Sequence, residues 1–377
     1  MNEHYLHYLW KLKRLPIHQM KLIDGKKFDL LDFGSYNEFE NGPDFKNGSI
    51  VLDELTWFGS IEMHVNASDW YKHKHHTDPN YNNVILHVVY NADSEVIQNG
   101  RIIPTLELKN WVDKSHYKQY QFLQKNKSTI PCKSLFHSVP ISYWENMKNR
   151  AIINRLTRKA AYFHKNQVNT LEYVFLQFVA RAFGSNVNQQ PFEQLLNSIN
   201  WRTLHEFTLD EFVSRINFLA FSDESHLSHQ WKSKGFRSIS NPPKRIGQLA
   251  VFIYNFDFKS DWLDLKPQDQ IEYFKSFFKQ NGIYDKSLFA NFIINAVAPF
   301  LFGLSTTEFK NTSSQEQAIS LLNILPSESN IFVKKWENIN VYPKSALDSQ
   351  ASLEIYQQFC VNKQCLNCTI GIKILNP

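Results

Sequence analysis

Apolar and polar residues alternate over much of the first third of the chain. Residues 49–65 alternate on both sides of Asp53 and Glu54, which predicts two strands joined by a tight turn. Residues 84–90 (VILHVVY) are almost continuously apolar and rich in β-branched side chains, as expected of a strand buried on both faces. Further strand candidates are residues 27–34 and 102–108. These segments together predict a sheet.

Helical spacing marks the start of the chain and most of its remainder. Residues 2–15 have this spacing, and Pro16 ends the predicted helix. From about Ser142 onwards, apolar residues recur three and four positions apart in successive segments separated by proline and glycine. We therefore predict two domains: an α/β (α+β) domain with a mixed sheet at residues 1–130, and a mostly α-helical domain with a C-terminal cysteine cluster at residues 141–377.

Composition supports a globular protein and excludes some classes. The chain has 377 residues, of which 43% are hydrophobic, and this is enough for two packed cores. No apolar run approaches the roughly 18 residues of a membrane span, and residues 1–16 are too polar for a secretory signal. We expect a cytoplasmic protein with no membrane partner. Phosphate-loop, dinucleotide and nucleophile-elbow motifs do not occur, so ATPase, dehydrogenase and esterase functions have no sequence support.

Two carboxylates and a histidine surround the predicted hairpin. Pro43-Asp44 precedes it, and Glu62-Met63-His64 lies in its second strand, where alternation puts Glu62 and His64 on one face. This pattern resembles the PD-(D/E)XK nuclease superfamily, with histidine in place of the usual lysine. The order of predicted elements (helix, strand, hairpin, crossover, buried strand) is also that of the superfamily's core. The resemblance implies a restriction-endonuclease-like fold in the first domain.

The resemblance also implies catalytic roles. Asp44 and Glu62 would bind Mg²⁺ or Mn²⁺, and Glu3 on the first helix would be a further catalytic carboxylate. His64 could accept a proton from water or ligate the metal, and ligation would favour Mn²⁺, Fe²⁺ or Zn²⁺ over Mg²⁺. In the alternative interpretation Asp44 caps a turn, while Glu62 and His64 form a polar pair on a solvated face.

A broader resemblance covers nearly the whole chain. The segments GPDF, WFGSIEMH, SDWYKHKHHTD, YNNVILHVVYNAD and CLNCTIG together resemble one uncharacterised bacterial family, a domain of unknown function. This resemblance implies no activity, so the chemistry depends on the residues themselves.

A histidine-rich segment follows the second hairpin strand. We predict that it forms a loop over Asp44 and Glu62 that contacts substrate, and the residues chosen for this role are Asp69, Trp70, His73, His75 and Asp78. The alternatives are a simple exposed polar loop or metal ligation by the loop.

Four cysteines form a second candidate metal site. Cys360, Cys365 and Cys368 are close in sequence, and Cys132 is the only other cysteine. Four thiolates suit Zn²⁺ or an iron–sulfur cluster. The arrangement is similar to that of recombination and CRISPR-adaptation nucleases, although there the lone cysteine precedes the nuclease core. The alternative is a set of reduced cysteines in a docked C-terminal segment.

Charge distribution favours a nucleic-acid partner. Between Lys109 and Lys165 there are twelve basic and two acidic residues, with aromatic residues interleaved. Such a segment can neutralise phosphates and stack on bases, or it can be an ordinary solvated helical face. We therefore hypothesise a metal-dependent phosphodiesterase acting on nucleic acid. The alternatives are a catalytically degenerate nucleic-acid-binding or scaffold protein, and a histidine-ligated zinc hydrolase of another substrate class. DNA versus RNA and the oligomeric state stay open.

Overall fold

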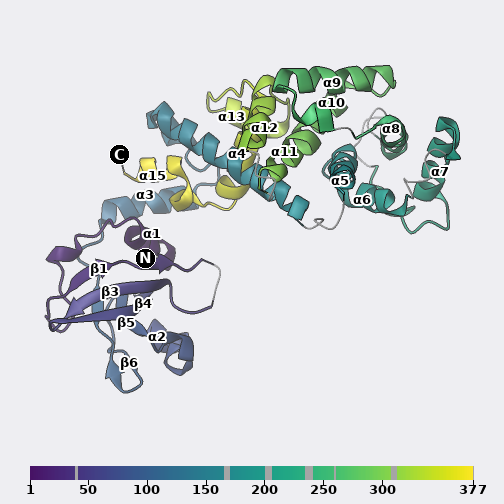
Figure 1. Cartoon of the computed structure of the whole chain (residues 1–377). Coiled ribbons are helices and arrows are strands. Elements are labelled where there is room, and N and C mark those ends of the chain that lie inside the picture. The colour runs from purple at the N-terminus through teal and green to yellow at the C-terminus, as the bar shows by residue number, and fades with distance from the viewer. Residues whose placement is uncertain are drawn as a thin grey trace. The chain divides into compact units, whose positions relative to one another are not determined.

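The structure is a computed structural model that describes residues 1–38, 41–164, 170–199, 206–233, 241–258, 260–306 and 312–376 (Figure 1). The chain divides into two compact units. Unit 1 comprises residues 1–139 and 363–377, and unit 2 comprises residues 140–362. Unit 1 is mixed α/β and unit 2 is helical, which confirms the fold prediction at this coarse level.

A curled mixed sheet forms the centre of unit 1 (Figure 1). Its strands are β1 (Asp29–Asp32), β2 (Ser35–Tyr36), β3 (Phe45–Leu52), β4 (Leu55–Asn66), β5 (Val84–Asn91) and β8 (Thr105–Glu107). The order is β1-β3-β4-β5-β8, and β2 also pairs with β3. Strand β3 runs antiparallel to β1 and β4, whereas β4, β5 and β8 run parallel to one another.

The remaining elements of unit 1 are helices and one small ribbon. The helices are α1 (Glu3–Lys11), α2 (Asp69–Lys72), α3 (Lys114–Lys125) and α15 (Thr369–Leu375), and the ribbon pairs β6 (Ile97–Gln98) with β7 (Arg101–Ile102). Helix α2 and two 3₁₀ turns, His75–Thr77 and Pro79–Tyr81, connect β4 to its parallel neighbour β5. This crossover contains the histidine-rich segment.

The turn between β3 and β4 confirms the predicted hairpin. Asp53 and Glu54 both have left-handed backbone conformations, with φ of 51° and 66°. Two such residues produce a turn whose twist matches the right-handed twist of the strands. Leu52 and Leu55 pair directly beside the turn, which sets the register of both strands.

Gly59 allows β5 to approach β4 closely. A Cβ atom at this position would lie 2.2 Å from the carbonyl oxygen of Asn83 and 2.6 Å from the Ile85 side chain. Only glycine therefore fits where the two strands begin to pair. The resulting register sets Glu62 opposite His87.

The last residues of the chain belong to unit 1, whereas the sequence analysis assigned them to the helical domain. Helix α15 packs against α3 and against the 3₁₀ helix Lys133–Ser138. The Lys363 ammonium donates to the carbonyl oxygen of Asn126 at 2.7 Å, and the Asn376 amide donates to the Tyr8 hydroxyl at 2.7 Å. These long-range hydrogen bonds and apolar contacts fix the segment, and they cannot be read from local spacing.

The regular secondary structure of unit 2 is helical in its described residues. The α-helices are α4 (Ile141–His164), α5 (Leu171–Phe183), α6 (Gln189–Ser198), α7 (Leu209–Phe221), α8 (Pro242–Asn255), α9 (Pro267–Gln280), α10 (Lys286–Phe292), α11 (Ala298–Leu304), α12 (Thr312–Ile324), α13 (Ile331–Glu337) and α14 (Ala346–Glu354). Two π-helical turns, Ile293–Val297 and Ile355–Cys360, interrupt this pattern. The continuous segment Lys286–Leu304 is long and apolar enough to cross a membrane, but 78% of its most apolar window is buried inside the protein, as in core helices.

Candidate functional site

Strand β4 carries Glu62 and His64 on one face, as the alternation predicts. Both side chains are buried, with exposures of 5% and 1%. Ile61 and Met63 on the opposite face are buried as well. Glu62 and His64 are therefore not a polar pair on a solvated face, which was the structural alternative in the sequence analysis.

Asp44, directly before β3, lies next to Glu62 on β4. The Asp44 amide donates to Glu62 Oε2 at 3.0 Å, and the Met63 amide donates to Asp44 Oδ2 at 3.0 Å. Each carboxylate thus accepts a backbone hydrogen bond from the other segment. Burial, followed by the charge of Asp44, raises the pKa of Glu62 well above its ordinary value.

Helix α1 brings His7 and Glu3 to the two carboxylates. His7 Nε2 lies 3.1 Å from Asp44 Oδ2, at ion-pair distance but without good hydrogen-bond alignment. Burial acts to lower the pKa of His7, yet the close Asp44 carboxylate and the charges of Glu3 and Glu62 outweigh it and raise the pKa. The sequence analysis named Glu3 but missed His7. The i, i+4 spacing of these two residues on a predicted helix was the available signal.

Three histidines converge beside Glu62. One nitrogen from each of His64, His73 and His75 lies within 4.8 Å of the other two. His64 Nε2 is 3.1 Å from His73 Nδ1, and Glu62 Oε1 is 3.3 Å from His75 Nε2 and 3.6 Å from His64 Nε2. Among the described residues, this is the single group of three or more His, Cys, Asp or Glu side chains whose ligand atoms all lie within 4.8 Å of one another. We call His64, His73 and His75 the histidine triad.

The buried histidines of the site favour the neutral form. Burial, followed by the charges of neighbouring histidines, lowers the pKa of His64 to about 2. Burial also lowers the pKa of His87 to about 3, and it lowers the pKa of His75. A neutral imidazole keeps a lone pair for a metal ion, whereas an imidazolium does not.

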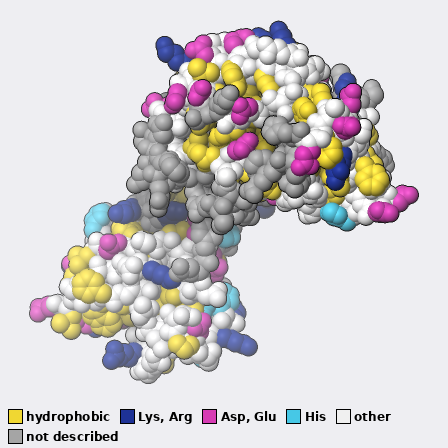
Figure 2. All heavy atoms as spheres, turned by 45° about the vertical axis from the view of Figure 1, so that its right-hand side comes forward, with side chains coloured by type: hydrophobic (Ala, Val, Ile, Leu, Met, Phe, Trp, Pro, Cys, Tyr) yellow, Lys and Arg dark blue, Asp and Glu magenta, His cyan; other side chains and the backbone are white. Residues whose placement is uncertain are grey.

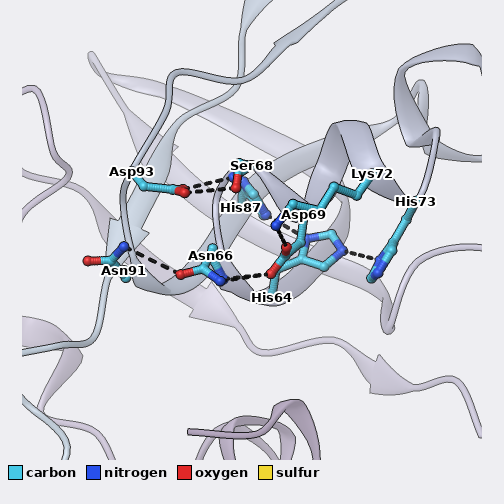
Figure 3. A network of polar contacts seen from close by, with 9 residues as sticks. All are labelled: His64, Asn66, Ser68, Asp69, Lys72, His73, His87, Asn91 and Asp93. Carbon is cyan, nitrogen blue, oxygen red and sulfur yellow. Dashed lines mark hydrogen bonds and ion pairs between the residues drawn. The ribbon is translucent and has the colours of Figure 1, made fainter.

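His87 on β5 fixes the ring of His64 from behind (Figure 3). His64 Nδ1 and His87 Nε2 are 2.8 Å apart. When His64 keeps its lone pair on Nε2, toward the triad, its Nδ1–H donates to His87. Metal-ligating histidines commonly donate their other N–H in this way. The Nδ1 atom of His87 is buried and has no hydrogen-bond partner among the described residues.

Asp69 and Asp78, which were also predicted to contact substrate, form hydrogen bonds within the crossover. Asp69 accepts from the Asn66 amide at 2.9 Å and from Lys72 at 2.6 Å, so it stabilises the first turn of α2 (Figure 3). Asp78 accepts from the Asn80 amide at 2.9 Å and caps the next 3₁₀ turn. These carboxylates order the loop that presents His73 and His75.

Trp70 does not lie where a substrate contact was predicted. Its side chain is fully buried and belongs to a hydrophobic cluster with Tyr81 and Val89. The ring packs edge-on against His75 and His87. Trp70 therefore supports the imidazoles and is not accessible to substrate, because the crossover folds back over β4 and β5.

Tyr81 completes the support of the triad and was missed from the sequence. Its ring stacks on His75, with centroids 3.8 Å apart and an angle of 24° between the planes. The stack restricts His75 to one orientation. No local sequence pattern predicts this stack, because the contact depends on how the two 3₁₀ turns fold.

Among the described residues, the four cysteines do not form a group of ligand atoms as close together as those of the histidine triad. Cys132, Cys365 and Cys368 belong to unit 1 and Cys360 to unit 2, and all four are buried. Burial, followed by the neighbouring thiols, raises the pKa values of Cys132 and Cys365 to about 12. Without a metal, thiols with such values are protonated at neutral pH. The predicted Zn²⁺ or iron–sulfur site stays a prediction.

Residues 109–139 of the basic segment belong to unit 1, and residues 140–165 belong to unit 2. In unit 2, several of its basic side chains form internal contacts, including Lys148 with Asp348 at 2.7 Å and Arg158 with Glu354 at 2.6 Å. Figure 2 shows acidic and basic side chains interspersed on one face of the molecule. The segment therefore gives weaker support for nucleic-acid binding than its composition suggested.

Comparison with known proteins identifies a family. A family model described as "Protein of unknown function (DUF2851)" matches residues 3–241, and the chain belongs to this family. The match includes every residue of the histidine triad and both carboxylates. The curated proteins and the solved structures give no match.

Proposed function

We propose that this member of the DUF2851 family is a metal-dependent phosphodiesterase acting on nucleic acid. The observation that carries the proposal is the histidine triad beside the buried Glu62 carboxylate. Glu62 and His64 are buried, His75 is half-buried and His73 is exposed, as expected of a site that holds a cation at the edge of the protein interior.

The donor set fits a transition-metal ion. The triad would supply three nitrogen ligands, and Glu62 Oε1 would supply an oxygen. Imidazole suits Zn²⁺, Mn²⁺ and Fe²⁺ better than Mg²⁺, so the softer ions are expected. When bound, such an ion would offset negative charge on a phosphoryl group and lower the pKa of a bound water.

The protein's own groups would move protons and balance charge. Burial disfavours the charged form of Glu62 in the metal-free site, and a coordinated cation would offset this penalty. The raised pKa of His7 favours its protonated form, which can donate to an anionic substrate or offset the charge of Asp44. His87 would hold His64 in its ligating tautomer.

Sequence and topology together support nucleic acid as the substrate class. Asp44 and Glu62 lie on a hairpin as in the PD-(D/E)XK pattern, and Glu3 and His7 lie on the preceding helix. The order α1, β1, β3–β4 hairpin, crossover and parallel β5 also matches the order that the resemblance implies.

A second candidate is a zinc hydrolase of another substrate class. The triad favours it, because three histidines with an open fourth position are a common catalytic zinc set. The same assay can separate the two candidates by including non-nucleic-acid esters.

The experiment is a cleavage assay with Mn²⁺, Zn²⁺ or Mg²⁺ and a panel of single- and double-stranded DNA and RNA. We expect cleavage by the wild type, a loss of at least about a hundredfold in Glu62→Gln and His75→Ala, and near-normal rates in His76→Ala. His76 is a matched control, since it is an exposed histidine beside the triad but outside it. Cleavage of p-nitrophenyl acetate but of no nucleic acid would select the second candidate. Inertness with every metal and substrate would contradict both.

A further inference from the structure

Unit 2 contains a cavity of about 520 Å³ that the proposed function does not use. Helices α4 and α5 form one side of it, and residues from the two π-helical turns form another. Its polar lining includes Arg155, Arg158, Lys159, Arg181, Asn295 and Gln357. A volume of this size suits a small-molecule ligand.

Helical periodicity sets the basic side chains of α4 on the same side of the cavity. Arg155, Arg158, Lys159 and Tyr162 are spaced i, i+3, i+4 and i+7, so they share one face of α4. Arg181 of α5 adds a third guanidinium group, and this group lies over the Tyr162 ring at 4.5 Å. Three guanidinium groups and the Lys159 amino group therefore line the cavity.

Two carboxylates form ion pairs with the basic groups that line the cavity. Arg155 and Arg158 share the single carboxylate of Glu354, at 3.2 and 2.6 Å, and Arg181 pairs with Glu193 at 2.6 Å.

Lys159 is different. Among the described residues it has no carboxylate within ion-pair distance, and its amino group donates to the side-chain oxygen of Asn295. Glu328, whose charge also acts on Lys159, accepts hydrogen bonds from Ser349 and Gln350. Burial lowers the pKa of Lys159 well below its ordinary value, so its neutral form is favoured when the cavity holds no anion. The three guanidinium groups then balance Glu193, Glu328 and Glu354, and a bound anion would favour protonation of Lys159.

Both π-helical turns contribute a polar residue to the lining. Asn295 lies in Ile293–Val297, and Gln357 lies in Ile355–Cys360. The Asn295 amide donates to Asn291 at 2.5 Å, which turns its oxygen toward Lys159. π-Turns weaken helix geometry and occur frequently at functional sites. Two of them at one cavity indicate that the site is built for a ligand.

We propose that this cavity binds a small ligand carrying phosphoryl groups, of about the size of a nucleotide. Phosphoryl oxygens match the planar donor pairs of arginine, and a doubly charged group can engage guanidinium and ammonium groups together. Three guanidinium groups and the Lys159 amino group offer many donors, which favours a phosphoryl group with several anionic oxygens over a single carboxylate. The inference stands independently of the proposed function, since the triad lies in unit 1.

The test is calorimetric titration of the full chain in buffer with EDTA, so that metal at the triad does not contribute. The probes are inorganic pyrophosphate, ADP, adenosine and citrate. We expect pyrophosphate and ADP to bind, citrate to bind more weakly, and adenosine not to bind. Lys159→Gln and Arg181→Gln should weaken pyrophosphate binding by at least about tenfold, the loss expected for one charged hydrogen bond.

The control is Lys275→Gln, which removes the same charge from α9, outside the cavity lining. If Lys159→Gln fails to fold, the half-exposed Arg158 permits the same test through Arg158→Gln. The proposal would be overturned if the folded wild type did not bind pyrophosphate, or if it bound citrate more tightly than pyrophosphate. It would also be overturned if Lys275→Gln weakened pyrophosphate binding as much as the cavity variants do.

Discussion

At the scale of single residues, the site of unit 1 is governed by burial and by pairing. Glu62 and His64 are both buried, and burial opposes the charged form of each. The pKa of Glu62 is therefore raised while that of His64 falls to about 2. A divalent cation would offset the penalty on the Glu62 carboxylate, and it would coordinate His64 in the neutral form that burial already favours.

The pH dependence of stability tests the account of His87 in metal-free protein. Unfolded histidine titrates near pH 6.5, whereas the pKa of folded His87 is about 3. Below pH 6.5 the unfolded state binds the proton that the folded state rejects, so stability falls as the pH drops. Replacing the residue, as in His87→Gln, should remove at most about 2 kcal/mol of this loss between pH 6.5 and 5.

Chemical denaturation of both proteins in EDTA at pH 7.5, 6.5 and 5 measures the effect. Glu62 and His7 have raised pKa values and act in the opposite direction, but they are present in both proteins and cancel in the difference. A difference in unfolding free energy that stays constant from pH 7.5 to 5 would show that His87 is not held neutral.

The residues of the site were only partly predictable. Asp44, Glu62 and His64 follow from strand alternation and the turn. Trp70 was assigned to substrate but lies in the core. His7 reaches the site only through packing of α1, and Tyr81 only through the fold of an irregular crossover. Local spacing contains no information about either packing.

At the scale of elements, the site depends on the contact between β4 and β5. The hairpin and β5 were predictable, since a two-residue turn and a buried apolar run are strong local signals. The parallel pairing of β4 with β5 sets His87 behind His64, and it requires the close approach at Gly59.

Gly59→Ala is expected to destabilise unit 1 by about 1–3 kcal/mol, the usual cost of overpacking. The added methyl group would meet the Asn83 carbonyl, a backbone atom that cannot move aside cheaply. Thermal unfolding followed by circular dichroism measures the change. Gly247→Ala in α8 is the matched control, since nothing lies within 4 Å of its added Cβ, and it should stabilise the protein by about 0.5–1 kcal/mol. Equal stability of the two variants would contradict the assigned role of Gly59.

At the scale of the whole molecule, unit 1 is made from both ends of the chain. Residues 363–377 return to it after unit 2, and Ile370, Ile374 and Leu375 are buried there. The change of pattern at about Ser142 was predicted from the sequence, but this last segment was assigned to the helical domain. Segments distant in sequence pack together through tertiary contacts, which helical periodicity does not encode.

A variant that ends at Asn362 is expected to loosen unit 1. It removes five buried side chains, of which Ile370, Ile374 and Leu375 each contribute about 1.5–3 kcal/mol on burial. Hydrogen exchange should rise in α3 and in Lys133–Ser138, which pack against α15, and should stay unchanged in α9. A variant ending at Asn376 retains α15 and the Asn376–Tyr8 hydrogen bond, and it is the control. Unchanged exchange in α3 after the longer truncation would contradict the assignment of this segment to unit 1.

The central claim is that the histidine triad holds a metal ion, and calorimetric titration of chelator-stripped protein with Zn²⁺ and Mn²⁺ tests it most directly. The account predicts one ion per chain for the wild type and for His76→Ala, and at least about tenfold weaker binding for His73→Ala and His75→Ala. Failure of the folded wild type to bind either ion, or equal binding by all four proteins, would contradict it.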